Sequence, residues 1–139
     1  MERTRLVWQE REQFAGIDHA GHALVLASEE GGGGVSPVDA LLLALAGCTA
    51  VGVLRIMTKK RQPLTGLEVV VSADREPEPP QRFRTIGLHF LARGVGIEAG
   101  DLEQAIELAD RKYCAVSGSL RPQVTITTSF EVNPDEGDR

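Results

Sequence analysis

Two cysteines, Cys48 and Cys114, have the residue type and placement to do chemistry in this chain of 139 residues. Cys48 lies inside a nearly all-apolar run at residues 36–54, and Cys114 lies near the end of a second helical pattern at residues 101–114. If these two helices pack together, they can bring the two thiols within bonding distance. For a disulfide this requires Cα atoms roughly 4.4–6.8 Å apart. The first hypothesis is therefore thiol redox chemistry.

Cys48 needs help from elsewhere in the molecule if its thiol is to be reactive. The thiolate is the reactive form, and an ordinary thiol has a pKa near 8.5. Cys48 lies about three turns into its predicted helix, too far from the N-terminus for the helix dipole to lower this pKa much. Arg55, two turns further along the same helix face, and Arg11 of the N-terminal segment are the candidate cations. The alternative interpretation makes Cys48 a small buried hydrophobic residue.

Cys114 has the sequence environment of a second, less reactive thiol. Its helical pattern brings it closer to Glu107 and Asp110 than to the apolar stripe. Neighbouring carboxylates and a helix C-terminus raise the pKa of a thiol. This asymmetry favours Cys48 as the attacking thiol and Cys114 as the resolving thiol.

The helix that carries Cys48 has a clear start. Ser36 is a preferred N-cap residue, Pro37 suits the first helical position, and Asp39 stands at the third position of a capping box. The helix is predicted to continue to about Lys60 and to stop before Pro63. Asp39 is interpreted as a cap rather than as a catalytic base.

The remaining patterns predict an α+β fold with helices on a mostly antiparallel sheet. The long helix is apolar nearly all round and must be covered on more than one side, which a homodimer would achieve. The predicted strands are residues 4–10, 23–27, 67–73, 83–92 and 124–132, with a turn at 15–22, a glycine-rich loop at 29–34 and an amphipathic helix at 101–114.

Length and composition predict one domain over residues 1–139, with strands and the glycine-rich loop in residues 1–35 and a flexible tail at 133–139. The net charge of −5 argues against binding to nucleic acid or to an anionic membrane. The N-terminus does not resemble a signal peptide, and the apolar run at 40–54 is too short to span a membrane. A cytoplasmic location is expected, where cysteines are reduced or redox-active rather than permanently bridged.

Other residues with potential chemistry have weaker patterns. His19, His22 and His89 show no metal-ligand spacing with the cysteines, so no metal site is expected. Ser117 has no Gly-x-Ser-x-Gly context, which leaves serine hydrolysis without support. The acidic residues of the second helix, which are Glu103, Glu107 and Asp110, are interpreted as a solvated face.

Two motifs resemble the OsmC/Ohr family, the osmotically inducible protein C and organic hydroperoxide resistance proteins. The segment 36–50 begins with Ser-Pro and ends with Gly-Cys-Thr-Ala, and residues 112–117 read Lys-Tyr-Cys-Ala-Val-Ser. The resemblance extends over nearly the whole chain. It implies an intertwined α+β homodimer with the long helices central between the sheets, and a thiol peroxidase site at the dimer interface.

The resemblance also implies roles for the two thiols. Cys48 matches the cysteine that attacks an alkyl hydroperoxide, and Cys114 matches the resolving cysteine that forms a disulfide with it. An external dithiol would then reduce that disulfide, with no bound cofactor. The expected partners are a second copy of the chain, the alkyl hydroperoxide and the dithiol, in an antioxidant stress response.

The chain departs from the family pattern at two places. Peroxidases of the family carry a glutamate directly after the proline, where this chain has Val38. They also use an arginine from the N-terminal segment, for which Arg11 is the nearest candidate, and Asp39 is a candidate for the missing carboxylate. The alternative hypothesis is a non-catalytic protein that senses redox state or binds an apolar small molecule.

Overall fold

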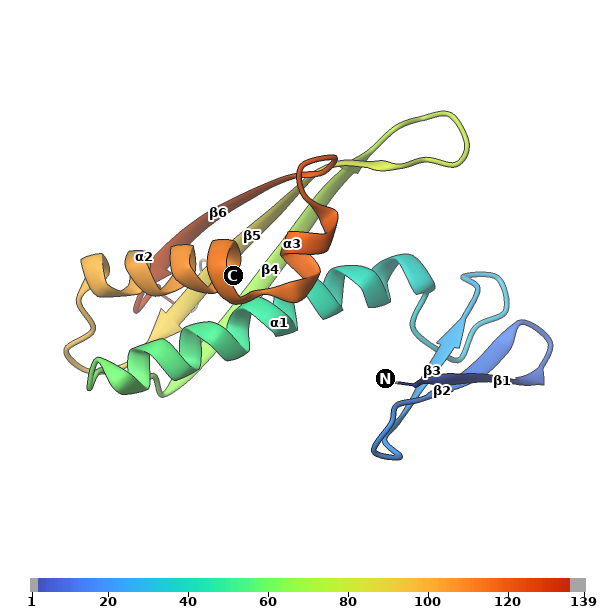
Figure 1. Ribbon diagram of the computed structural model, residues 1–139, viewed down its shortest axis with the longest axis horizontal. Coiled ribbons are helices and arrows are strands. Elements are labelled where there is room, and N and C mark those ends of the chain that lie inside the picture. The colour runs from blue at the N-terminus through green and yellow to red at the C-terminus, as the bar shows by residue number, and fades with distance from the viewer. Residues whose placement is uncertain (1–2, 136–139) are drawn as a thin grey trace. The chain divides into compact units, whose positions relative to one another are not determined.

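The computed structural model describes residues 3–135 and has the mixed α+β architecture that the sequence predicts (Figure 1). It contains two three-stranded sheets, β1-β2-β3 and β4-β5-β6. The chain divides into two compact units between Leu43 and Ala44, called here the N-terminal and the C-terminal unit. The assignment of one domain to residues 1–139 stays a prediction. Most of the tail expected at 133–139 lies outside the described residues.

The N-terminal unit is an antiparallel sheet of β1 (Arg5–Glu10), β2 (Gln13–Ile17) and β3 (Ala23–Ala27). The turn expected at 15–22 is shorter, because Ala15 and Gly16 pair with Val25 and Leu24 inside the sheet. The turn itself covers residues 18–22, where the Asp18 side chain accepts hydrogen bonds from the backbone of residues 20 and 22. The expected strand at 23–27 is confirmed.

Helix α1 (Pro37–Lys59) begins where the capping signals predict it. The Asp39 backbone N–H donates to Ser36 Oγ at 3.1 Å, which satisfies one of the free donors of the first turn. One side of the helix is buried, with Leu45, Val53 and Met57 fully inaccessible. Leu54, on another side, is 44% exposed, as expected for a helix that is apolar nearly all round.

The length argument against a membrane-spanning segment does not hold for α1. The helix has 23 residues and is long and apolar enough, by length and composition only, to cross a bilayer. Core helices of globular domains meet the same criterion, so this single helix is weak support for a membrane span.

The C-terminal unit contains β4 (Gly66–Arg75), β5 (Phe83–Arg93) and β6 (Thr125–Val132). β4 and β5 are antiparallel, whereas β5 and β6 are parallel, so the sheet is mixed. Ile86, Leu88 and Phe90 alternate along β5 and are buried on the face of the sheet that α1 and α2 (Ala99–Leu108) cover (Figure 1).

The prediction of a second helix at 101–114 is wrong at the C-terminal end of that helix. α2 ends at Leu108, and residues Ala109–Tyr113 form a π-helical turn. Cys114 is extended, with φ −79° and ψ 109°, and a further short helix, α3 (Ala115–Leu120), begins directly after it. Cys114 therefore stands at the start of a helix rather than at the end of one.

Candidate functional site

Cys48 lies in the part of α1 that belongs to the C-terminal unit. Its thiol is half-buried, whereas the adjacent Thr49 is completely inaccessible. The Thr49 hydroxyl donates to the carbonyl of Leu45 at 3.1 Å, one turn earlier. This bond holds the Thr49 side chain against the helix, so that its oxygen lies beside the site of the second thiol.

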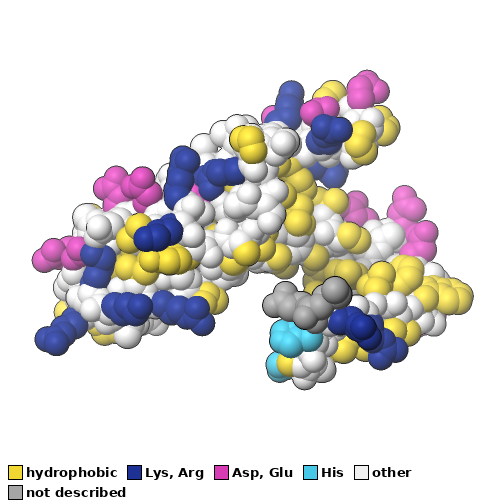
Figure 2. Space-filling view, viewed as in Figure 1, with side chains coloured by type: hydrophobic (Ala, Val, Ile, Leu, Met, Phe, Trp, Pro, Cys, Tyr) yellow, Lys and Arg dark blue, Asp and Glu magenta, His cyan; other side chains and the backbone are white. Residues whose placement is uncertain are grey.

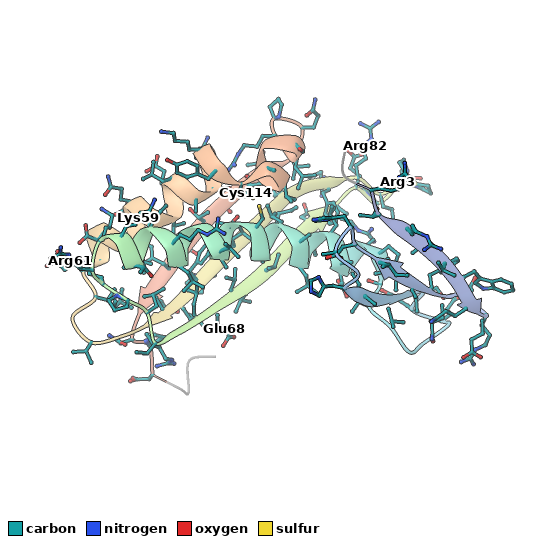
Figure 3. The ribbon with its side chains drawn as sticks, turned by 60° about the horizontal axis from the view of Figure 1, so that its bottom comes forward. Arg3, Lys59, Arg61, Glu68, Arg82 and Cys114 are labelled. Atoms are coloured by element: carbon teal, nitrogen blue, oxygen red, sulfur yellow. The ribbon has the colours of Figure 1, made fainter. Side chains whose placement is uncertain are left out.

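Cys114 caps α3 with its sulfur. The Ser117 backbone N–H donates to Cys114 Sγ at 3.3 Å, an arrangement in which a thiol takes the place of the usual serine or aspartate cap. Cys114 is buried at 6% exposure, and in Figure 3 its labelled side chain points toward α1. The sulfur is thus fixed by the helix that follows it.

The two thiols are free and lie within hydrogen-bonding reach of each other. Burial raises the pKa of Cys48, but three hydrogen bonds outweigh burial and bring this pKa below its ordinary value. The donors are the Cys114 thiol and the backbone N–H groups of Val116 and Ala115. The first amides of α3 therefore help to lower the pKa of Cys48, whereas the N-terminus of α1 is too distant to do so.

The pKa of Cys114 is shifted in the opposite direction. Burial raises it first, and the neighbouring Cys48 sulfur raises it further. The neighbouring Thr49 side chain and the hydrogen bond from the Ser117 backbone N–H lower it, but they do not cancel the rise. The direction agrees with the sequence argument, but the cause is burial and Cys48 rather than Glu107 and Asp110. Cys48 is thus expected to ionise at a lower pH than Cys114.

The charged candidates Arg11, Asp39 and Arg55 are all exposed. Arg11 accepts a hydrogen bond from Trp8 Nε1 at its backbone carbonyl, at 2.7 Å. Asp39 lies in the first turn of α1. Arg11 and Asp39 belong to the N-terminal unit, and a role for any of the three toward Cys48 stays a prediction.

Sequence reasoning missed a buried polar cluster beside Cys114. Asp110 was interpreted as part of a solvated face, but it is only 4% exposed. It pairs with Arg121 through two hydrogen bonds of 2.8 and 3.0 Å and accepts a third from Ser117 Oγ at 2.6 Å. The signal in the sequence was the spacing of two polar residues, Asp110 four residues before Cys114 and Ser117 three residues after it.

Two of the three histidines, His22 and His89, contact acidic or hydroxyl side chains of their own units. His22 Nδ1 is 3.1 Å from Asp18 Oδ2 in an exposed turn. His89 lies between Ser129 and Glu131 on the sheet, at 2.6 and 2.8 Å. Within residues 3–135, no group of three or more histidine, cysteine, aspartate or glutamate side chains could hold a metal ion.

Comparisons with known proteins match this architecture. The chain is 34% identical over 130 residues to protein YhfA of Escherichia coli K12, covering 94% of this chain and 97% of YhfA. A solved structure of a hypothetical protein from Aquifex aeolicus VF5 is 26% identical with a TM-score of 0.86, covering 98% of both chains. The organic hydroperoxide resistance protein OhrB of Bacillus subtilis shares the fold at 13% identity, with a TM-score of 0.63 and coverage of 94% and 98%. The family model for OsmC-like proteins matches residues 30–129, and the chain belongs to the OsmC-like family.

Proposed function

We propose that this protein reduces organic hydroperoxides through a two-cysteine cycle, with Cys48 as the attacking thiol and Cys114 as the resolving thiol. The observation that carries the proposal is the asymmetric thiol pair. Cys48 is half-buried and the neighbouring Cys114 thiol helps to lower its pKa, whereas burial raises the pKa of Cys114. A more readily formed thiolate beside a protonated thiol is the starting state that such a cycle needs.

The steps balance without a bound cofactor. The Cys48 thiolate attacks the terminal oxygen of the hydroperoxide and breaks the O–O bond; the alkoxide leaves and takes a proton from solvent, which yields an alcohol and a Cys48 sulfenic acid. The Cys114 thiol then attacks the Cys48 sulfur, which releases water and forms the disulfide. An external dithiol donates two electrons and two protons by thiol–disulfide exchange and restores both thiols.

The surroundings of Cys48 favour an organic hydroperoxide over a small polar one. Val51 and Leu54, on the following turns of α1, are 46% and 44% exposed and offer apolar surface for an alkyl or aryl group. Free thiols also suit a reducing compartment, so we propose a cytoplasmic location.

A second candidate function rests on Val38. This residue stands where peroxidases of the family carry glutamate, and it is 36% exposed. A protein without that carboxylate would bind an apolar molecule or sense redox state by slow, stoichiometric oxidation of the same thiol pair. Repeated turnover separates the two functions, because a sensor is oxidised once and a peroxidase many times.

Intact-mass analysis tests the proposed cycle. Reduced protein treated with one equivalent of cumene hydroperoxide is expected to lose about 2 Da quickly as the disulfide forms. Added dihydrolipoamide should restore the original mass, and the cycle should repeat with each further equivalent of peroxide. Slow gain of oxygen on one thiol, with no loss of 2 Da, would contradict the peroxidase cycle and favour the sensing or binding function.

We also propose that the protein is a homodimer. Large apolar side chains are exposed on both units, among them Leu6, Trp8, Leu24 and Leu54, and Figure 2 shows hydrophobic side chains at the surface of each unit. Light scattering is expected to give twice the chain mass of 15.0 kDa. Leu54→Lys should shift the mass toward the monomer, whereas Val95→Lys, at a fully exposed turn position, should not. A monomeric wild-type protein would refute the dimer.

A further inference from the structure

A buried polar cluster of Asp110, Ser117 and Arg121 connects three elements around Cys114. The Arg121 guanidinium donates to both carboxylate oxygens of Asp110, to Ser117 Oγ and, at 2.9 Å, to the carbonyl of Ile126 in β6. Burying a carboxylate is costly unless it is paired and hydrogen-bonded, and Asp110 meets both conditions. The cluster therefore fixes the π-helical turn, α3 and β6 to one another.

Cys114 lies inside this cluster in the sequence, four residues after Asp110 and three before Ser117. Ser117 makes the connection, because its hydroxyl donates to the Asp110 carboxylate while its backbone N–H donates to the Cys114 sulfur. The position of the Cys114 sulfur is thus set from the same residue that holds the carboxylate.

α3 requires such support, because a helix of six residues is too short to be stable alone. Gly118 in its middle weakens it further. The first two amides of this helix, those of Ala115 and Val116, are among the groups that lower the pKa of Cys48. If α3 frays, these donors lose their fixed direction, and Cys48 loses the groups that favour its thiolate.

We propose that Asp110, Ser117 and Arg121 act as positioning residues that hold the Cys114 turn and the first amides of α3 against Cys48. For the catalytic cycle this inference rests on the proposed function. The three side chains of the cluster do not contact a reacting sulfur; the cluster acts through the backbone N–H of Ser117, which donates to Cys114 Sγ, and through the backbone of α3.

Asp110→Asn tests the cluster, because its amide –NH₂ would place a donor against the Arg121 guanidinium. The readouts are the pH profile of Cys48 alkylation, followed by peptide mass, and the rate of Cys48–Cys114 disulfide formation with diamide. The midpoint of the wild-type profile is expected below that of an ordinary cysteine. In Asp110→Asn it should rise by about one unit, which lowers the alkylation rate at neutral pH about tenfold. Disulfide formation should slow to a similar extent.

Ser117→Ala provides a milder variant if Asp110→Asn does not fold. It removes the connecting hydroxyl but keeps the Asp110–Arg121 pair and the backbone cap on Cys114, so a shift of about threefold in both rates is expected, as for the loss of a single hydrogen bond. Asp101→Asn is the matched control, because Asp101 is another helical carboxylate that pairs with a cation, Lys60, at 3.4 Å, but it lies in α2, outside the cluster. It should leave both rates unchanged.

The inference would be overturned if a folded Ser117→Ala variant kept the wild-type pH profile of Cys48 alkylation and the wild-type rate of disulfide formation. It would also be overturned if Asp101→Asn shifted both readouts as much as the cluster variants do. Neither readout uses a peroxide. If the wild-type protein fails to turn over peroxide while the cluster variants shift the Cys48 profile, the proposed function fails and the positioning role stands. If the wild-type protein turns over peroxide and the cluster variants do not shift the Cys48 profile, the proposed function stands and the positioning role fails.

Discussion

Cys48→Ser is expected to abolish the dithiol-dependent consumption of organic hydroperoxide. A serine hydroxyl does not ionise near neutral pH, so the hydrogen bonds from α3 that favour a thiolate at this position have no anion to stabilise. Loss of a nucleophile lowers turnover by about a thousandfold or more, in practice to the uncatalysed rate. The measurement is the decay of cumene hydroperoxide in the presence of excess dihydrolipoamide.

Cys114→Ser is the matched variant and should fail at a different step. Its hydroxyl can still donate toward Cys48, so the first oxidation is expected to proceed and to stop at a sulfenic acid, with a gain of about 16 Da. No loss of 2 Da should follow, because the resolving sulfur is absent. If Cys48→Ser turned over peroxide at the wild-type rate, the assigned chemistry would be wrong.

The elements with local signals could be predicted from the sequence. Ser36 and Pro37 mark the start of α1, and the alternating residues of β5 mark a half-buried strand; both predictions are confirmed. The end of α2 could not be predicted, since the apolar periodicity of residues 101–114 continues through it. The π-helical turn and α3 depend on contacts with residues that the periodicity does not contain, above all Arg121.

The site could be predicted in part for the same reason. The residue types identify Cys48 and Cys114, and family motifs relate them, but their pKa values depend on burial, on the other thiol and on backbone amides, and no sequence pattern displays these tertiary contacts. Asp110 shares a helical stripe with Glu103 and Glu107, and its ion pair with Arg121 and its hydrogen bond from Ser117 distinguish it from these solvated residues. Tertiary contact, rather than residue type, decides which carboxylate is buried.

Gly52→Ala is expected to destabilise the protein and to separate the thiols, although alanine is the better helix former. Gly52 lies one turn after Cys48 in α1, and a Cβ there would be 2.8 Å from the Cβ of Ala109 and 3.4 Å from its Cα. Ala109 is buried at 1% exposure, directly before Asp110, and has no flexible end that could move aside. α1 and the π-helical turn must therefore move apart, at a cost of about 1–3 kcal/mol, as for other overpacked cores.

The same displacement should slow disulfide formation, because Cys48 and Cys114 are carried by the two segments that separate. Urea denaturation measures the loss of stability, and the diamide reaction measures the separation of the sulfurs. Gly100→Ala is the control: Gly100 is also helical, a Cβ there meets nothing within 4 Å, and the substitution should stabilise the protein by up to about 1 kcal/mol. A Gly52→Ala variant as stable as Gly100→Ala, with an unchanged diamide rate, would show that close contact at Ala109 does not hold the thiol pair together.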